Sequence, residues 1–279
     1  MLAYGGARLH LIMDYLLILL AVSLAFSGLG WIYFIYFFSI GYGFSIAALA
    51  ITLTVLFRDA LSVPTVLMCI VMVIFGCRLG LYLLTREKRS AEYKKILYGP
   101  DAAKKKPLPV VIVVWLFCAL LYVGQISPLA FFLANKTDGA AVNEVWPWIG
   151  AVIMALGVIL EASADAQKKA AKEVNPNKFV DTGLYKLVRC PNYLGELVIW
   201  TGSFIVCFGG CCNLWQWIIA SLGYLGIVYV MFSGARRLEL RQDLVYGSDP
   251  TYQAYRSKTP ILLPFIPLYS VAKHKWLQA

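Results

Sequence analysis

A succession of apolar runs, most long enough to cross a membrane as a helix, limits most strongly how this 279-residue chain can fold. A spanning helix needs about 20 apolar residues. Such runs occupy residues 11–27, 30–57, 63–85, 108–133, 146–164, 194–211 and 214–233. We therefore predict an all-α integral membrane protein, a bundle of seven transmembrane helices. The second run is too long for one upright helix, so it either tilts or breaks near Gly41-Tyr42-Gly43, which would give eight spans.

Composition excludes other classes of protein. Apolar types make up 60% of the chain and charged types 14%, against roughly 45–50% and about 25% in soluble domains. The net charge of +10 resembles that of a nucleic-acid-binding protein, but the Lys and Arg residues are concentrated in three segments between or after the apolar runs. Eight lie in 86–107, six in 165–191 and seven from 234 onward, with almost none in the loops between. The positive-inside rule places these three segments in the cytoplasm, with the amino terminus outside and the carboxyl terminus inside.

Histidine and cysteine content argues against a metal site. The only two histidines, His10 and His274, lie near opposite ends of the chain, so a membrane di-iron cage is excluded and a zinc site is disfavoured. The seven cysteines are odd in number, form no Cys-x-x-Cys motif and lie mostly in apolar runs. We interpret them as reduced, small apolar residues.

Ionisable residues at membrane depth are costly, so each is a candidate for function. Arg78 lies in the third run, with Tyr82 one helical turn later on the same face. This pair either contributes to a substrate or cofactor pocket, or consists of an arginine that snorkels or forms a structural ion pair. Glu161 and Asp165 end the fifth run, close to Lys168 and Lys172. They form either a helix-end salt-bridge network or a site for a ligand with hydroxyls and phosphates, which we favour.

Two later segments combine polar side chains with turn signals. Gly183 permits a tight turn, and Pro191-Asn192 is typical of a helix start, whose backbone donors bind anions. Glu196 follows Asn192 by one turn. The alternative for this segment is a capped helix without a ligand, and the alternative for the tail at 234–267 is an amphipathic helix on the membrane surface.

Four separated blocks resemble one family. In order they are Asp165-x-Gln167-Lys168, Asp181-x-Gly183-Leu184-Tyr185, Arg189-x-Pro191-Asn192-Tyr193-x-Gly195-Glu196 and Tyr252-x-x-Tyr255-Arg256-x-x-Thr259. They resemble the membrane steroid 5α-reductase family and its bacterial relatives, which are NADPH-dependent enone reductases. The third block is more distantly similar to sterol reductases and isoprenylcysteine carboxyl methyltransferases. The resemblance covers roughly residues 145–270 and is weak before residue 100.

The resemblance implies NADPH held near the cytoplasmic ends of the later spans. Asp165, Asn192 and Glu196 would hold its ribose, amide or nicotinamide end, and Lys172 and Arg189 would meet phosphates. The tail would close over it. The full set of expected cofactor-binding residues is Asp165, Lys168, Lys172, Arg189, Asn192, Tyr193, Glu196, Tyr252, Tyr255 and Arg256.

Two departures from the family pattern concern the chemistry. Cys190 stands where the family usually has histidine, and the second run, 30–57, contains neither Gln nor Glu to supply the expected Gln-Glu pair that polarises the substrate ketone. Tyr82, tuned by Arg78 or Arg86, is our candidate for the catalytic group. The expected reaction is hydride transfer to the C=C bond of an apolar, steroid-like enone.

The expected organisation is 1–107 for the substrate cavity and 108–279 for the reductase-like region. Expected partners are an apolar steroid or lipid substrate and membrane lipids, without nucleic acid, for a monomer in the bacterial inner membrane or endoplasmic reticulum. Two alternatives stay open. One is a lipid methyltransferase that uses S-adenosylmethionine, and the other is a non-catalytic membrane protein that retains the fold.

Overall fold

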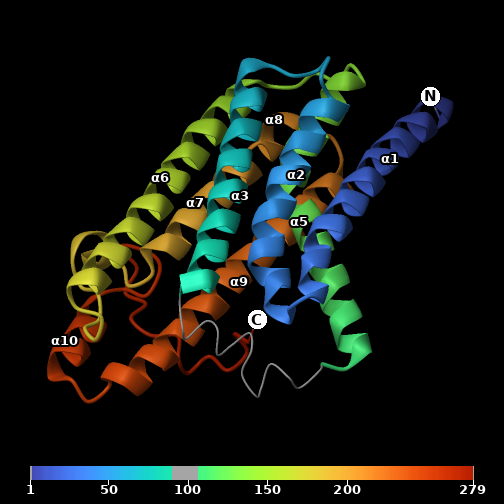
Figure 1. Cartoon of the computed structure of the whole chain (residues 1–279). Coiled ribbons are helices and arrows are strands. Elements are labelled where there is room, and N and C mark those ends of the chain that lie inside the picture. Colours follow the sequence, from blue (N-terminus) through green and yellow to red (C-terminus); the bar gives the residue numbers. More distant parts are fainter. Residues whose placement is uncertain (1, 90–105, 279) are drawn as a thin grey trace. The chain divides into compact units, whose positions relative to one another are not determined.

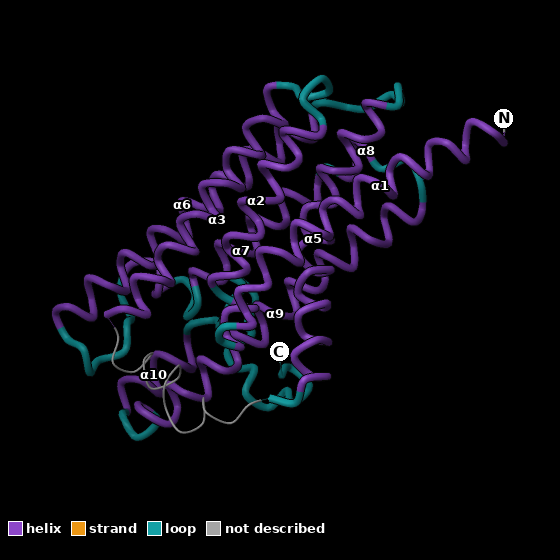
Figure 2. The backbone as a smooth tube through the Cα atoms, turned by 45° about the vertical axis from the view of Figure 1, so that its right-hand side comes forward, coloured by secondary structure: helices purple, strands orange, loops and turns teal. Residues whose placement is uncertain are grey.

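The computed structural model describes the backbone of residues 2–89 and 106–278, and the side chains of 12–85 and 106–278. Within these residues the chain forms helices and loops and no strand (Figure 2). The all-α prediction is therefore confirmed for the described part of the chain. Most of the basic segment 86–107, including Lys104 and Lys105, lies outside the described residues.

The helices follow the apolar runs closely at their amino-terminal ends and often extend further at the other (Figure 1). They are α1 (Leu2–Ser27), α2 (Ile40–Leu56), α3 (Val63–Arg89), α5 (Leu108–Thr137), α6 (Val145–Val174), α7 (Pro191–Ile205), α8 (Cys207–Gly210), α9 (Leu214–Tyr246) and α10 (Pro250–Lys258). Three short 3-10 helices are η1 (Gly28–Trp31), η2 (Phe34–Phe38) and η3 (Gly183–Lys186).

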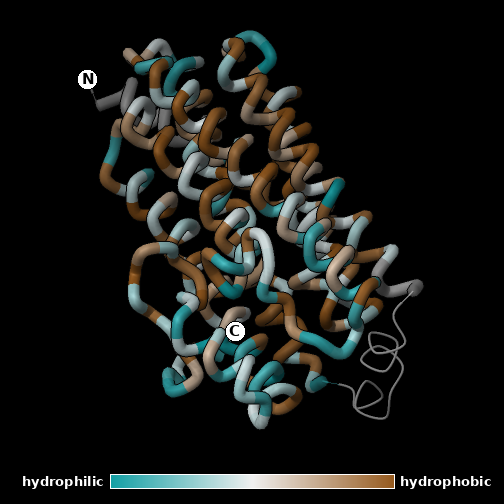
Figure 3. Tube along the Cα trace, turned by 90° about the vertical axis from the view of Figure 1, so that its left-hand side faces the viewer, coloured by the Kyte–Doolittle hydropathy of each residue, from teal (hydrophilic) through white to brown (hydrophobic). Residues whose placement is uncertain are grey.

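Within the described residues, six helical segments are long and apolar enough to cross a membrane: 12–31, 63–85, 108–137, 145–174, 191–210 and 214–246. Their apolar residues run along the helices, whereas hydrophilic residues gather in the loops (Figure 3). The seventh expected span is the shorter helix α2, of 17 residues. The run 30–57 is thus not one helix, and its break falls in η1 and η2, just before the glycines at which we placed it.

The described chain divides into two compact units. The first contains residues 1–151 and 203–223, and the second contains 152–202 and 224–279. In the first unit α2 packs against α1, α3 and α5. Because α6, α7 and α9 are long, each contributes residues to both units.

Glycines allow α2 and α3 to approach closely in the first unit. A Cβ atom added at Gly76 would lie 2.4 Å from the carbonyl oxygen of Gly43, and one added at Gly43 would lie 2.8 Å from the amide nitrogen of Gly80. Close approach of small residues is a common way for membrane helices to gain van der Waals contact. Gly43 is therefore a packing residue within α2 and not a break in it.

Candidate functional site

The end of α6 and the start of α7 pack closely in the second unit. A Cβ atom added at Gly195 would lie 2.7 Å from the amide nitrogen of Glu161, and one added at Gly157 would lie 2.7 Å from that of Ile199. The two helices are therefore antiparallel at this contact. At 3.6 residues per turn, Asp165 lies one turn beyond Glu161 and level with the first turn of α7.

The predicted acids and amide all lie on these two helix ends. Glu161 and Glu196 are buried, with 3% and 7% of their surface exposed, and Asp165 and Asn192 are half-buried. The Asn192 side chain has no hydrogen bond to any residue in the described part of the chain. Tyr193 faces away toward α9, where its ring packs on Gly234. The register therefore places Asp165 near the level of Asn192, and Glu196 one turn further along α7, near the level of Glu161.

The second sequence block lies directly on α6. Gly183 has a φ of +58°, which favours glycine, and a Cβ atom there would lie 2.3 Å from Gln167 Oε1. The amide nitrogen of Leu184 donates to the same Gln167 oxygen at 2.8 Å. The Tyr185 hydroxyl donates to the carbonyl oxygen of Ala164 at 3.3 Å. The predicted tight turn is confirmed, and it attaches η3 to α6.

The fourth block completes the group. The Tyr255 hydroxyl of α10 donates to the carbonyl oxygen of Tyr185 at 2.7 Å. The amide of Arg189 donates to the carbonyl of Pro260 at 2.9 Å, which joins the segment after α10 to the residues before α7. Hydrogen bonds thus bring together four blocks that lie as much as 90 residues apart in the sequence.

A buried ion network lies at the centre of this group. Arg189 Nη2 donates to Glu239 Oε1 at 2.9 Å, and Arg256 Nε donates to the same oxygen at 3.1 Å. The other oxygen, Oε2, accepts from the amide of Val271 at 2.8 Å. Glu239 is fully buried and the Arg189 side chain is 1% exposed. Arg256 also reaches Asp243 at 3.1 Å. This network explains why Arg189 and Glu239 can be buried together, with the partly exposed Arg256 as a further partner.

Arg189 retains unused donors. Its Nε and Nη1 atoms are buried and have no hydrogen-bond partner within the described residues. Buried donors are almost always paired in native proteins, and an unpaired one needs an explanation such as a ligand or water. Only Nη2 of Arg189 forms structural hydrogen bonds, so Nε and Nη1 are left for the predicted contact with a phosphate.

The tail residues form an aromatic cluster. The Phe179 ring lies 5.2 Å from that of Tyr252 and stacks at 5.3 Å on that of Tyr255. The Tyr252 hydroxyl donates to Asp243 Oδ1 at 2.9 Å. Burial raises the pKa of both tyrosines, so each hydroxyl stays protonated as a donor. Both predicted cofactor residues thus have structural bonds within the protein.

The two predicted lysines differ in their surroundings. Lys172 Nζ donates to the carbonyl oxygens of Pro176 and Lys178 at 2.9 and 2.7 Å and to the Tyr246 hydroxyl at 3.0 Å. It therefore holds the loop after α6, with its donors directed at the protein. Lys168 is half-buried and lies near enough to Cys190 for its charge to act on that thiol.

Cys190, in place of the family's histidine, is fully buried. Its amide donates to the carbonyl of Ile261 at 3.0 Å. Burial raises the pKa of its thiol to about 12, which outweighs the opposite effect of the neighbouring Arg189 and Lys168. It is therefore a neutral thiol at physiological pH. All seven cysteines are free, as predicted.

The two predicted catalytic residues belong to α3 in the first unit. Arg78 and Tyr82 are half-buried. Tyr82 packs against a small core cluster formed by Tyr36, Ile40 and Leu83. The Arg86 side chain lies outside the described residues.

Glu239 is the site residue that sequence reasoning missed. Its spacing from Asp243 marks one face of α9, but nothing in the sequence pairs it with Arg189, 50 residues earlier. The one available signal was an acidic residue within the charged carboxyl-terminal part of α9, between Arg237 and Arg241. No group of three or more metal-ligating side chains occurs in the part of the chain that the structure describes.

Comparisons with known proteins give two distant relatives. The chain is 28% identical over 172 residues to an uncharacterized protein of Schizosaccharomyces pombe, covering 52% of this chain and 48% of that protein. It is 26% identical over 111 residues to the polyprenal reductase of Danio rerio, covering 40% and 31%. The chain therefore spans less than half the length of each relative. No solved structure matches it.

A family model described as a protein of unknown function, DUF1295, matches residues 37–259, which is most of the chain. The match includes α2 to α10 and all four sequence blocks. This family includes steroid 5α-reductase-like proteins. The chain is a member of the DUF1295 family.

Proposed function

We propose that this protein is a membrane reductase that transfers hydride from NADPH to the conjugated C=C bond of an apolar lipid carbonyl compound. The observation that carries the proposal is the convergence of the four blocks on the end of α6 and the start of α7. Residues far apart in the sequence are held there by bonds that a simple capped helix does not need.

The residues fit a nicotinamide dinucleotide phosphate. When bound, this cofactor supplies the hydride. Asp165 and Glu196 offer carboxylates for ribose hydroxyls, and Asn192 offers a half-buried amide with no partner among the described residues. The two orphaned nitrogen atoms of Arg189 are suited to a phosphate or carboxamide oxygen. Lys168 adds positive charge nearby. Tyr193, Tyr252, Tyr255, Arg256 and Lys172 position these groups by packing and hydrogen bonding.

The relative from Danio rerio indicates the substrate class. Its name is polyprenal reductase, and polyprenal is a long isoprenoid aldehyde. A long isoprenoid and a steroid-like enone share an apolar body and a carbonyl that gains negative charge during hydride addition. We assign stabilisation of that oxygen to the Tyr82 hydroxyl, with Arg78 one turn earlier to favour hydrogen-bond donation.

The proposal includes the topology. Helix α2, although 17 residues long, would complete seven spans, with the amino terminus outside and the cofactor site and carboxyl terminus in the cytoplasm. Residues 1–107 would supply the substrate cavity and 108–279 the cofactor loops, in a monomer. The membrane is the bacterial inner membrane or the endoplasmic reticulum.

Direct binding of two tritiated cofactors to the purified protein in lipid nanodiscs tests the proposal. We expect saturable binding of NADPH and none of S-adenosylmethionine. Binding of only S-adenosylmethionine would overturn it in favour of a methyltransferase. With cofactor bound, NADPH consumption is measured with a polyprenal and with 3-oxo-Δ4 steroids, and absence of turnover with both would contradict the substrate assignment.

Two variants locate the cofactor. We expect Glu196→Gln and Asn192→Ala each to weaken NADPH affinity about tenfold, the value of one good hydrogen bond to a charged or polar ligand. Thermal stability should be nearly unchanged. Lys169→Ala is the matched control, because Lys169 is exposed and pairs only weakly, at 3.9 Å, with Glu173. Large losses of stability with unchanged affinity would instead support a capped helix without a ligand.

A third variant tests the catalytic assignment. Tyr82→Phe removes one hydroxyl and leaves the ring that packs on the core cluster. We expect turnover to fall by a factor of roughly 10² or more, as for removal of an acid or oxyanion donor, with NADPH affinity retained. An unaltered rate would remove Tyr82 from the mechanism.

A further inference from the structure

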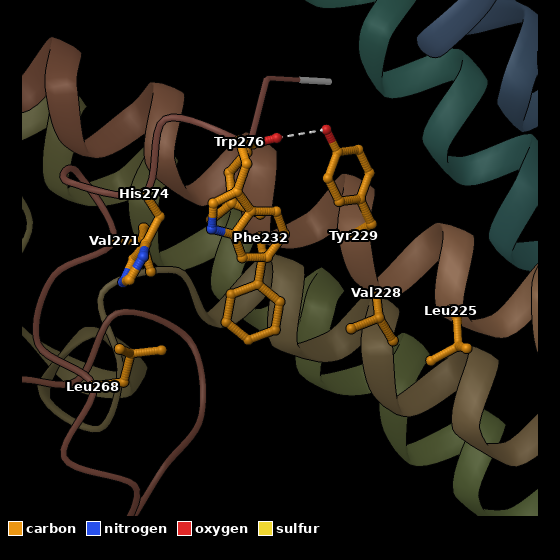
Figure 4. A pocket seen from close by; sticks show the side chains of 9 residues that line it. Leu225, Val228, Tyr229, Phe232, Leu268, Val271, His274 and Trp276 are labelled. Atoms are coloured by element: carbon orange, nitrogen blue, oxygen red, sulfur yellow. Dashed lines mark hydrogen bonds between the residues drawn. The ribbon is translucent and has the colours of Figure 1, made fainter.

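An apolar pocket lies between α9 and the carboxyl-terminal segment (Figure 4). Its volume is about 340 Å³, within the range of small-molecule sites. Aliphatic and aromatic side chains from two segments line it, among them Leu225, Val228, Phe232, Leu268, Val271 and Leu277. It is accessible, because Leu225 is 60% and Trp276 is 68% exposed.

Polar contacts hold the carboxyl-terminal segment over α9. Arg236 donates to the carbonyl oxygens of Ala272 at 3.1 Å and of Leu277 at 3.4 Å. The Tyr229 hydroxyl donates to the carbonyl oxygen of Trp276 at 2.9 Å, and the two rings stack at 6.1 Å (Figure 4). The pocket walls are therefore fixed, and collapse of the segment onto α9 would break these bonds.

Positive charge lies at the rim. Lys273, His274 and Lys275 are consecutive in the segment and all exposed. His274 lines the pocket. Neither lysine forms an ion pair with any residue whose side chain the structure describes. The pocket therefore joins an apolar interior to a cationic edge with free charges.

The pocket lies at the depth of lipid chains. Its α9 residues precede Arg236 by 4 to 11 positions, about 6 to 17 Å along the axis at 1.5 Å per residue. Half of a hydrocarbon layer is about 15 Å thick. We place Arg236 at the membrane interface, which sets the apolar lining against acyl chains and leaves the adjacent lysines available to lipid phosphates.

We propose that this pocket binds an anionic membrane phospholipid, with one acyl chain against Val228 and Phe232 and its phosphate at Lys273 and Lys275. Charge complementarity selects the anionic headgroup, and the apolar lining selects the chain. The pocket borders the ion network, because Val271 lines the one and donates to Glu239 of the other, but lipid binding there does not depend on the reductase function.

The test is lipid titration of the delipidated full-length protein, followed by native mass spectrometry, with phosphatidylglycerol and phosphatidylcholine as the two probes. We expect tighter binding of phosphatidylglycerol. Lys273→Ala/Lys275→Ala should weaken it about 25-fold, at about fivefold per lysine near a lipid surface, and leave phosphatidylcholine unaffected. Val228→Trp, which fills the pocket, should weaken both lipids.

The matched control is Lys169→Ala/Lys258→Ala, which removes two exposed lysines elsewhere. If this control weakens phosphatidylglycerol binding as much as the rim variant does, the attraction is diffuse and the proposal is wrong. It is equally overturned if the rim variant keeps its preference for phosphatidylglycerol. Because both lysines are on the surface, the rim variant is expected to fold normally, and its melting temperature verifies this.

Discussion

Glycines bring helix backbones into contact in both units, as Gly157 and Gly195 do in the second, but the two units differ in how they accommodate charge. In the first unit, Gly43 and Gly76 bring helix backbones into contact, and buried hydroxyls bond to main-chain carbonyls, as Ser23 does to Ala119. Its described ion pairs, such as Lys136–Glu144, are partly exposed. In the second unit, Arg189 and Glu239 form a fully buried pair at 2.9 Å.

The difference follows from the surroundings of each unit. Helices within lipid gain no hydrophobic driving force from packing together, so close contact and neutral hydrogen bonds stabilise them. Buried charges need several additional partners. In the second unit the segment after α10 supplies them, through the Val271 amide and the Tyr269 carbonyl oxygen. Burying a charged side chain therefore costs less free energy in the second unit than in the first.

The largest expected effect is at Glu239. Glu239→Gln keeps the shape but leaves the buried Arg189 charge uncompensated, so we expect unfolding free energy to fall by about 3–5 kcal/mol. Thermal unfolding in detergent measures it. Asp243→Asn is the control, because Asp243 is 26% exposed and the effect should be about 1 kcal/mol or less. Equal effects of the two variants would show that the network is not the main stabilising feature.

The corresponding change in the first unit is Gly76→Ala. The added Cβ would lie 2.4 Å from the Gly43 carbonyl oxygen, so α2 and α3 must separate, at a cost of about 1–3 kcal/mol. The same unfolding assay measures it. Gly28→Ala should be nearly neutral, because nothing lies within 4 Å of a Cβ atom there. A neutral Gly76→Ala would mean that α3 is free to shift and that glycine packing does not define this unit.

A smaller effect is expected at Lys172. Lys172→Met keeps the length of the side chain but removes its hydrogen bonds to the loop carbonyls and to Tyr246. We expect a loss of about 1 kcal/mol, confined to the loop. Hydrogen exchange of residues 175–182 measures it, with Lys169→Met as the exposed control. Unchanged exchange in the Lys172 variant would refute the role of this lysine in holding the loop.

The smallest effect at neutral pH is expected at Cys190. Burial raises its thiol pKa from 9.0 to about 12. The unfolded state therefore loses the proton first, so this thiol lowers stability progressively as the pH rises from about 9 to about 12, and the loss persists above that range. We expect Cys190→Ala to flatten the loss of stability in that range.

Thiol labelling gives a second test of the burial of Cys190. At pH 8 the exposed Cys212 should react with a maleimide, whereas Cys190 should react only after unfolding. Rapid labelling of Cys190 in the folded protein would contradict its burial.

Much of the architecture could be predicted from the sequence because hydropathy acts locally. The starts of α3, α5 and α9 fall where the apolar runs begin. Pro191 marked the start of α7 and Gly183 a tight turn, since each restricts its own backbone dihedrals. The sequence predicted a helix break at Gly41 and Gly43, slightly later than the break before α2. Glycine favours both helix breaks and close helix packing, and here both glycines lie within the helix.

The site was predictable only in part. Asp165 lies level with the start of α7 because glycines let α6 and α7 pack closely. The sequence blocks do not specify which residues of the two helices meet. Tyr252 and Arg256 were identified as important, but their partners, Asp243 and Glu239, were not. Long-range pairing depends on how helices pack, and spacing along one helix contains no information about its partner.

By itself, the sequence determined the membrane character of this chain, the positions of most helices and its family blocks. Each of these depends on residues close together in the chain, where hydropathy and backbone restrictions act. Only the tertiary structure decided that Arg189 pairs with Glu239 and that the carboxyl-terminal segment encloses a pocket on α9. Those features require segments distant in sequence to meet, and the free energy that selects such contacts comes from burial and charge compensation in the folded protein.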